Sequence, residues 1–228
     1  MRCYSKRQST LRKEENEMTI LGRGDLIKKI RDRRLVVSPI LSSRQIGAAS
    51  IDLRMGNVVL MVRARGSSHV DPAAGIVKKS KKHSQYTELY RQQKHERYEI
   101  PFDTKFLLHP GSLALVPTLE WLKLPSDISG TVTARSSWAR EGLSIATATL
   151  IEPNYEGIAT LELANLGQIP IALYPGLRIA QIAFIKVQGH TKRPVTNKAQ
   201  FSLSFEPVQG NISQDDLAFI PSDPTEGI

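Results

Sequence analysis

Short apolar runs, each closed by a proline, glycine or asparagine corner, recur along most of the chain. The runs at residues 51–62, 100–108, 112–121 and 158–163 are rich in alternating or β-branched apolar positions, which is typical of β-strands. Corner residues recur at His109-Pro110-Gly111, Asn154, Gly167, Pro175-Gly176 and Gly189. Many short strands with very little helix predict a mainly β fold, either a barrel or a sandwich.

One helix and three less regular segments surround this β region. Residues 24–34 place Leu26, Ile27 and Ile30 on one side, which predicts a short amphipathic N-terminal helix. Residues 1–17 are polar and without periodicity, and we expect a disordered extension. We expect a β domain at 18–190, interrupted by a basic insertion at about 66–98 that forms a loop with a short helix, and a C-terminal tail at 191–228.

Composition and charge narrow the function classes. The 228 residues fit one domain, no apolar run is long enough to cross a bilayer, and Cys3 is the only cysteine. These features predict a cytoplasmic protein without a disulfide framework or a membrane association. The net charge is +9, yet residues 1–17 hold five basic and three acidic residues, and residues 78–98 hold seven basic and two acidic. The fold itself is therefore near charge balance, and a nucleic-acid partner is not expected.

A polar cluster, a turn and one acid are the candidates for chemistry. Arg135, Ser136, Ser137 and Arg140 lie within six residues, and guanidinium and hydroxyl donors at this density suit phosphate oxygens. The turn at residues 152–157 joins two β-rich runs and predicts a hairpin. Glu162 is the one acid in an otherwise apolar strand, so it is either a paired core carboxylate or a catalytic one. Asp52 and Arg54 are two residues apart on a predicted strand, and we expect them to form a structural pair.

These residues also resemble a known family. The stretch A-R-S-S-W-A-R-E-G-L at 134–143, Thr147-Ala148, I-E-P-N-Y-E-G at 151–157 and Leu161-Glu162 is similar to motifs of the dCTP deaminases, in the trimeric dUTPase-like superfamily. Further matches are S-I-D-L-R-M-G at 50–56, His109-Pro110-Gly111, Thr118-Leu119-Glu120, Leu124-Pro125 and Tyr174-Pro175-Gly176. The resemblance implies a distorted jelly-roll and a homotrimer whose active sites are shared between subunits.

The resemblance also implies an activity, namely deamination of dCTP to dUTP and ammonia, which supplies dUTP and dUMP for thymidylate synthesis. The H-x-E and P-C-x-x-C signatures of zinc deaminases are absent, so the implied reaction is zinc-independent. Glu162 would shuttle protons, and Arg140, Ser136 and the Ala148 backbone would complete the catalytic set. Mg²⁺ would be bound by the oxygens of the triphosphate.

The remaining implied contacts bind the nucleotide. The substrate-binding set comprises Arg135, Ser136, Ser137, Trp138, Ala139, Arg140, Glu152, Tyr155, Thr160, Leu161, Glu162 and Lys198. The residues around the 152–157 turn would read the pyrimidine and sugar, and Tyr155 is either a sugar-stacking residue or a hydrophobic plug. The 191–228 tail would close over the phosphates as a lid.

Alternatives arise from three departures from the family pattern. Glu152 replaces an aspartate, Asn154 replaces a glycine, and the tail lacks the family's two tyrosines and glutamine, with Lys198 standing in for its lysine. Asn tolerates the left-handed backbone of such a turn better than most residues do. One alternative is an enzyme that also hydrolyses dUTP, or a dUTPase; another is a catalytically weak nucleotide-binding regulator, with dTTP as a further candidate ligand.

Overall fold

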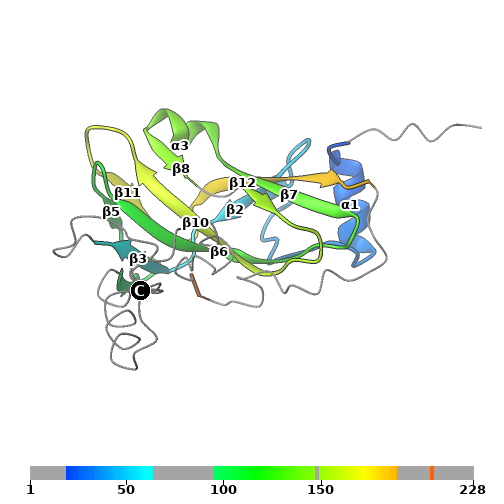
Figure 1. Cartoon of the computed structure of the whole chain (residues 1–228), viewed down its shortest axis with the longest axis horizontal. Helices are drawn as coiled ribbons and strands as arrows, with labels where there is room; N and C mark the ends of the chain where they lie inside the picture. Colours follow the sequence, from blue (N-terminus) through cyan, green and yellow to red (C-terminus); the bar gives the residue numbers. More distant parts are fainter. Residues whose placement is uncertain (1–18, 64–94, 147–148, 189–205, 208–228) are drawn as a thin grey trace, which may run out of the picture.

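The computed structural model describes residues 19–63, 95–146, 149–188 and 206–207, and these residues form a mainly β fold with a short N-terminal helix (Figure 1). Expectations for residues 1–17, for most of the basic insertion and for nearly all of the tail lie outside the described residues. None of the helices in the described ranges is long and apolar enough to cross a lipid bilayer.

The elements that the structure describes are mostly short. Their bounds are α1 Arg23–Arg31, β1 Val36–Ser38, η1 Ser43–Gln45, β2 Ile51–Arg54, β3 Val58–Val62, β4 His95–Glu99, β5 Phe106–Leu108, β6 Leu113–Lys123, β7 Ile128–Ala134, α3 Ser136–Arg140, β8 Leu143–Ile145, β9 Leu150–Ile151, β10 Glu156–Asn165, β11 Ile171–Leu173 and β12 Arg178–Lys186.

Two sheets enclose the core. The larger has the order β4-β3-β6-β10-β8 with β1 beside β6, the second has the order β2-β12-β7-β9, and β11 pairs with β5. Alternate residues of both sheets meet in one apolar cluster, to which β10 contributes Leu161 and Leu163 and β12 contributes Ile182 and Phe184. Each of these four side chains is fully buried. Side chains alternate between the two faces of a strand, so the apolar positions of each strand share one face. The apolar faces of the two sheets pack against each other as a sandwich.

Helix α1 covers one end of the β layers (Figure 1). Leu26 is its buried anchor, while Asp25 in the first turn and Lys28, Lys29 and Arg31 in the last turn match the helix dipole. The helix expected at 24–34 is therefore confirmed, although it ends three residues earlier, at Arg31.

The single strand expected at 51–62 is wrong, because the chain changes sheets in the middle of this run. Strand β2 belongs to the smaller sheet and β3 to the larger one, with Met55, Gly56 and Asn57 between them. The Gly56 amide donates to the Pro117 carbonyl at 2.8 Å, and a Cβ at Gly56 would lie 2.8 Å from Cγ of Pro117. Glycine allows this close approach, which brings the corner against β6.

Two neighbouring expectations also need correction. Residues 95–98, assigned to the end of the basic insertion, belong to strand β4 (His95–Glu99), which pairs with β3 along its whole length. The strand expected at 100–108 is confined to Phe106–Leu108, because Pro101 opens a turn in which the Thr104 amide donates to the Pro101 carbonyl at 3.0 Å.

The turn at residues 152–157 does not form the expected hairpin. Strand β9 before it pairs with β7, whereas β10 after it pairs with β6 and β8. The turn therefore carries the chain from one sheet to the other. Asn154 adopts φ 65°, in the left-handed region that asparagine tolerates, as the sequence indicated.

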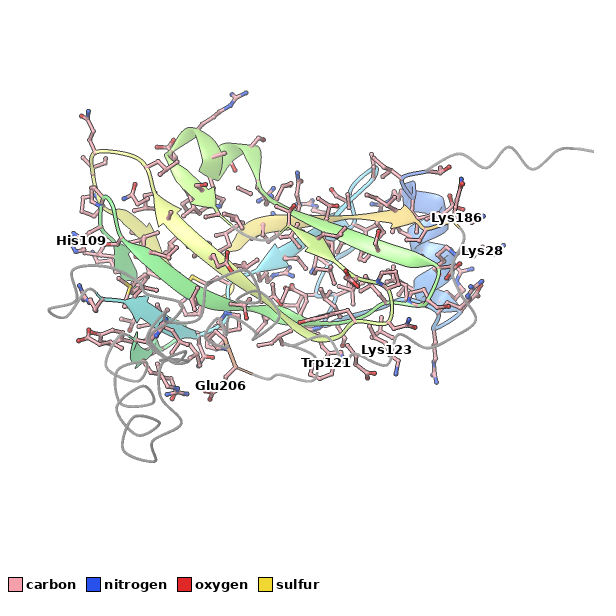
Figure 2. All side chains as sticks on the ribbon, viewed as in Figure 1. Lys28, His109, Trp121, Lys123, Lys186 and Glu206 are labelled. Carbon is pink, nitrogen blue, oxygen red and sulfur yellow. The ribbon has the colours of Figure 1, made fainter. Side chains whose placement is uncertain are left out.

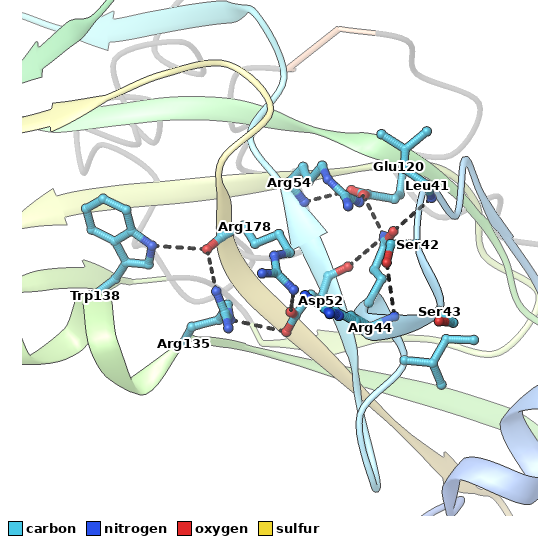
Figure 3. A network of polar contacts seen from close by, with 12 residues as sticks. Leu41, Ser42, Ser43, Arg44, Asp52, Arg54, Glu120, Arg135, Trp138 and Arg178 are labelled. Carbon is cyan, nitrogen blue, oxygen red and sulfur yellow. Dashed lines mark hydrogen bonds and ion pairs between the residues drawn. The ribbon is translucent and has the colours of Figure 1, made fainter.

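Glu120 is a buried carboxylate that joins the two sheets (Figure 3). Its side chain is completely buried on β6 and accepts hydrogen bonds from Arg54 N–H at 2.8 Å, Arg54 Nη1 at 3.0 Å and Gln45 Nε2 at 2.8 Å. Burial raises the pKa of Glu120, and the hydrogen bonds from Arg54 act in the opposite direction. Arg54 thus pairs with Glu120 rather than with Asp52, which corrects the pairing expected from the sequence.

We expect Glu120→Ala to lower the free energy of unfolding by about 3–5 kcal/mol, because it leaves the Arg54 guanidinium buried without its carboxylate. Urea denaturation measures this loss. Glu99→Ala is the matched control, since the Glu99 side chain is 66% exposed and lies 3.8 Å from Arg97; its cost should stay below about 0.5 kcal/mol. A cost below about 1 kcal/mol for Glu120→Ala would contradict this account of the ion pair.

Candidate nucleotide site

The cationic cluster lies on a short, exposed helix. Helix α3 follows β7 and precedes β8, and Ser136, Ser137, Ala139 and Arg140 on it are all exposed. The Arg135 carbonyl accepts from the Trp138 and Ala139 amides at 3.0 Å each, which closes this single turn. Of the donors that the sequence assigned to phosphate, Ser136, Ser137 and Arg140 are therefore presented to solvent.

A glycine ends this helix. Gly142 has φ +88°, and a Cβ there would lie 2.7 Å from the Gly167 amide nitrogen. The Leu166 amide donates to the Gly142 carbonyl at 2.9 Å, so the end of α3 packs against the turn after β10. This packing fixes where α3 lies relative to β10, the strand that carries Glu162.

Arg135 is held from several sides (Figure 3). Its Nε lies 3.2 Å from Oδ1 of Asp52, and its Nη1 donates to the Arg178 carbonyl at 3.2 Å. Trp138 Nε1 donates to the same carbonyl at 3.0 Å. Arg178 itself binds Oδ2 of Asp52 through Nη1 at 3.1 Å.

Sequence reasoning missed Asp52 and Arg178 as members of this site. Arg178 is 126 residues from Asp52, and only the pairing of β2 with β12 brings them together. The available signal was the position of Arg178 two residues after the matched Tyr174-Pro175-Gly176. A charged residue next to a matched turn was a candidate for the site.

Glu162 lies near the middle of β10, between the fully buried Leu161 and Leu163. It belongs to the other, less buried face of the strand, with Thr160 and Ala164. Within the described ranges no hydrogen bond or ion pair engages its carboxylate, and burial raises the pKa of Glu162. A half-buried carboxylate that holds its proton more readily than usual is suited to accept and return protons.

Strand β8 connects the two parts of the site. It pairs with β10 through Ile145 opposite Leu163, and the Ala146 amide donates to the Glu162 carbonyl at 2.8 Å. The four steps from Gly142 to Ala146 span about 13 Å of extended chain. Helix α3 and Glu162 therefore lie near opposite ends of β8, an arrangement that suits a ligand with two chemically different ends.

The other predicted site residues occupy varied positions. The Tyr155 hydroxyl donates to the Ile158 carbonyl, and the ring packs against the core, as the plug alternative requires. Burial raises the pKa of Tyr155 to about 12. Glu152 is exposed, whereas the Leu161 side chain is fully buried and leaves only its backbone for a ligand. Ala148 and Lys198 lie outside the described residues.

The donor set of the described residues suits an anion. Among these residues no group of three His, Cys, Asp or Glu side chains is arranged to hold a metal ion. His109 lies at the end of the molecule opposite Lys28 and Lys186 (Figure 2). Asp52, the acid that contacts the cationic cluster through Arg135, already binds two arginines.

The fold and this site define a dUTPase-like protein with a candidate nucleotide site. The family described as dCTP deaminase-like matches residues 20–187. The chain belongs to the dCTP deaminase family of enzymes, in the dUTPase-like superfamily, which confirms the resemblance seen in the sequence.

Relatives of two kinds support this assignment. A "dCTP deaminase, dUMP-forming" from Dictyoglomus turgidum is 37% identical over 79% of this chain and 87% of its own length. A "dCTP deaminase" from Rhodospirillum rubrum is 32% identical over 85% of this chain and 97% of its own length. The crystal structure of 2'-deoxycytidine 5'-triphosphate deaminase from Agrobacterium tumefaciens matches with a TM-score of 0.54 at 24% identity, over 74% of this chain and 48% of that chain. This last likeness concerns the fold.

The raised pKa of Glu162 leads to a prediction about stability. A group whose pKa is higher in the folded state contributes stability that is present below its unfolded pKa and is lost as pH rises through the folded value. Glutamine at position 162 cannot ionise, so the Glu162→Gln variant does not lose this stability. It should melt about 1–3 °C above the wild type near pH 7.5. The two melting temperatures should converge near pH 4.

Differential scanning calorimetry at both pH values measures this difference, with the exposed Glu141→Gln as the control. An equal or lower melting temperature for Glu162→Gln at pH 7.5 would show that the carboxylate is stabilised by a partner in the native protein.

Proposed function

We propose that the protein deaminates dCTP to dUTP and ammonia without zinc, with Glu162 as the proton-transfer residue. The observation that carries this proposal is the environment of Glu162, a half-buried carboxylate with a raised pKa at the end of β8 away from the cationic helix. Family membership supplies the substrate class, since relatives of this chain are named dCTP deaminases.

In the proposed reaction the oxygen of water bonds to C4 of cytosine and Glu162 accepts a proton from it. One proton of the water passes to the ring nitrogen and the other to the amino group. The bond between C4 and the amino nitrogen then breaks, a C4 carbonyl remains, and ammonia leaves. Arg140, Ser136 and the Ala148 backbone complete the catalytic set. Because α3 and Glu162 of one subunit lie near opposite ends of β8, Arg140 and Ser136 would reach the base from α3 of a neighbouring subunit. One carboxylate suffices because it accepts and returns protons in turn.

We assign the phosphates to the α3 end of the site. Arg135 and Arg140 supply charge, while the hydroxyls of Ser136 and Ser137 and the backbone at Trp138 and Ala139 supply neutral donors. Mg²⁺ enters with the triphosphate, whose oxygens hold it. Lys198 and the C-terminal tail would close over this end as a lid.

The base and sugar belong at the Glu162 end. Thr160 shares the less buried face of β10 with Glu162, and the Leu161 backbone runs between them. Glu152 and Tyr155 are the sugar-contacting candidates. The exposure of Ser136, Ser137 and Arg140 in a single chain supports a homotrimer in which a neighbouring subunit completes each site.

A second activity is favoured by the relatives named dUMP-forming. In that case the protein also hydrolyses dUTP to dUMP and pyrophosphate, and the same carboxylate would activate water for attack at phosphorus. A regulator that binds dCTP, dUTP or dTTP without turnover is the remaining alternative.

Product analysis separates these functions. The protein is incubated with Mg²⁺ and either dCTP or dUTP, and dUTP, dUMP, ammonia and pyrophosphate are resolved. We expect ammonia and dUTP from dCTP. Formation of dUMP and pyrophosphate would establish the second activity, and binding without any product would support the regulator and refute the deaminase.

We expect Glu162→Gln to reduce kcat for deamination by at least about 10³-fold, because glutamine cannot accept and return the proton. Affinity for the triphosphate should change little, since the phosphate-binding residues lie on α3. Isothermal titration with dCTP and rate measurements on the same preparation test both statements. A variant that deaminates at the wild-type rate would refute the role assigned to Glu162.

A further inference from the structure

Arg135 is fixed more completely than a surface phosphate-binding residue requires. Its backbone amide donates to the Ile179 carbonyl at 3.0 Å, and its Nη1 donates to the Arg178 carbonyl at 3.2 Å. Its Nε faces Asp52 at 3.2 Å, and its side chain is 31% exposed. Nη2 has no hydrogen-bond partner in the part of the chain that the structure describes, so this donor remains for a ligand.

A bulge in β12, on the side that pairs with β2, lies next to two of these contacts. The register with β2 shifts between Arg178 and Ala180, which leaves Ile179 as the extra residue. The Ile179 side chain is fully buried, while the consecutive carbonyls of Arg178 and Ile179 both accept from Arg135. Both carbonyls therefore face the junction of β7 and α3.

Asp52 is shared between two guanidinium groups. Oδ1 faces Arg135 Nε, and Oδ2 accepts from Arg178 Nη1 at 3.1 Å, with the Asp52 side chain 14% exposed. Two cations on one carboxylate leave an excess positive charge, and each guanidinium keeps donors that the carboxylate does not occupy.

The backbone of Asp52 is also fixed. Gln45 Nε2 donates to the Asp52 carbonyl at 2.9 Å and to Oε1 of the buried Glu120 at 2.8 Å (Figure 3). The carboxylate therefore extends from a rigid part of the core toward the two arginines, and little freedom remains to be lost when an anion binds.

We propose that Asp52 is a positioning residue that holds Arg135 and Arg178 together as a two-guanidinium clamp for the nucleotide's phosphates. Arg178 is thereby a second cation of the phosphate site. This inference rests on the proposed function, since it presumes that the α3 end of the site binds phosphate.

An effect of charge alone and a loss of positioning predict opposite changes in anion binding when the Asp52 carboxylate is removed. Neutralising a carboxylate beside a phosphate site raises the local positive potential, which would strengthen anion binding. Loss of positioning would weaken binding, because an asparagine side chain offers an amide N–H in place of one acceptor, and this donor repels an arginine. The direction of the change therefore distinguishes the two explanations.

The test compares Asp52→Asn with the wild-type protein. We expect KM for dCTP to rise about tenfold or more, and the inhibition constant of inorganic tripolyphosphate to rise by a similar factor. The value of kcat should stay within about threefold of wild type, because the chemistry occurs at the Glu162 end.

Asp127→Asn is the matched control. Asp127 binds Arg34 at 3.3 Å, its side chain is 18% exposed, and it lies before the start of β7, whereas Arg135 follows the end of that strand. This variant should leave KM and the tripolyphosphate inhibition constant unchanged.

The outcomes are distinct. An unchanged or lower KM in Asp52→Asn would overturn the positioning role, and absence of both dCTP turnover and tripolyphosphate binding in the wild type would overturn the proposed function together with this inference. If circular dichroism shows that Asp52→Asn does not fold, Asp52→Glu replaces it, because it keeps the charge but displaces the carboxylate by one methylene. A raised KM with a near-wild-type melting temperature then supports positioning, and an unchanged KM refutes it.

Discussion

The buried carboxylate of Glu120 is the interaction on which the arrangement of the two sheets depends. It lies on β6 of the larger sheet and binds Arg54 of β2, which belongs to the smaller one. An ion in the core is costly unless its hydrogen bonds are satisfied, so β2 and β6 can pack together in only a narrow range of positions. After β2, Gly56 allows the chain to change sheets against Pro117 of β6.

This constraint reaches the candidate site through Gln45. The Gln45 amide nitrogen contacts both Glu120 and the Asp52 carbonyl, so the core ion pair and the Asp52 carboxylate share one hydrogen-bonded support (Figure 3). From Asp52 the contacts continue to Arg135 and Arg178. Contacts that start in the core therefore hold the Arg135 and Arg178 guanidinium groups in place. Helix α3 itself is a single exposed turn with little stability of its own.

The sequence was most informative where local pattern decides structure. The alternation around β6 and β10 and the spacing of Leu26 and Ile30 were sufficient to predict these elements. Local pattern does not determine which sheet a strand joins, and for this reason the hairpin at 152–157 and the unbroken strand at 51–62 were wrong. The cationic cluster and Glu162 could be selected from residue types. Arg178 had only the weaker signal of a charged residue beside a matched turn, because its contact with Asp52 depends on the pairing of strands that are distant in the sequence.

Three carboxylates in this molecule differ mainly in environment, and the environment determines what each can do. Glu120 is fully buried and its carboxylate is bound by Arg54 and Gln45, which suits a structural role. Asp52 is slightly exposed and bound by two arginines, which suits orientation of those cations rather than proton transfer. Glu162 is half-buried, and within the described ranges no cation offsets the effect of burial on its pKa. Of the three, Glu162 is the one whose carboxylate no described residue engages, and this environment suits the proton transfer proposed for it.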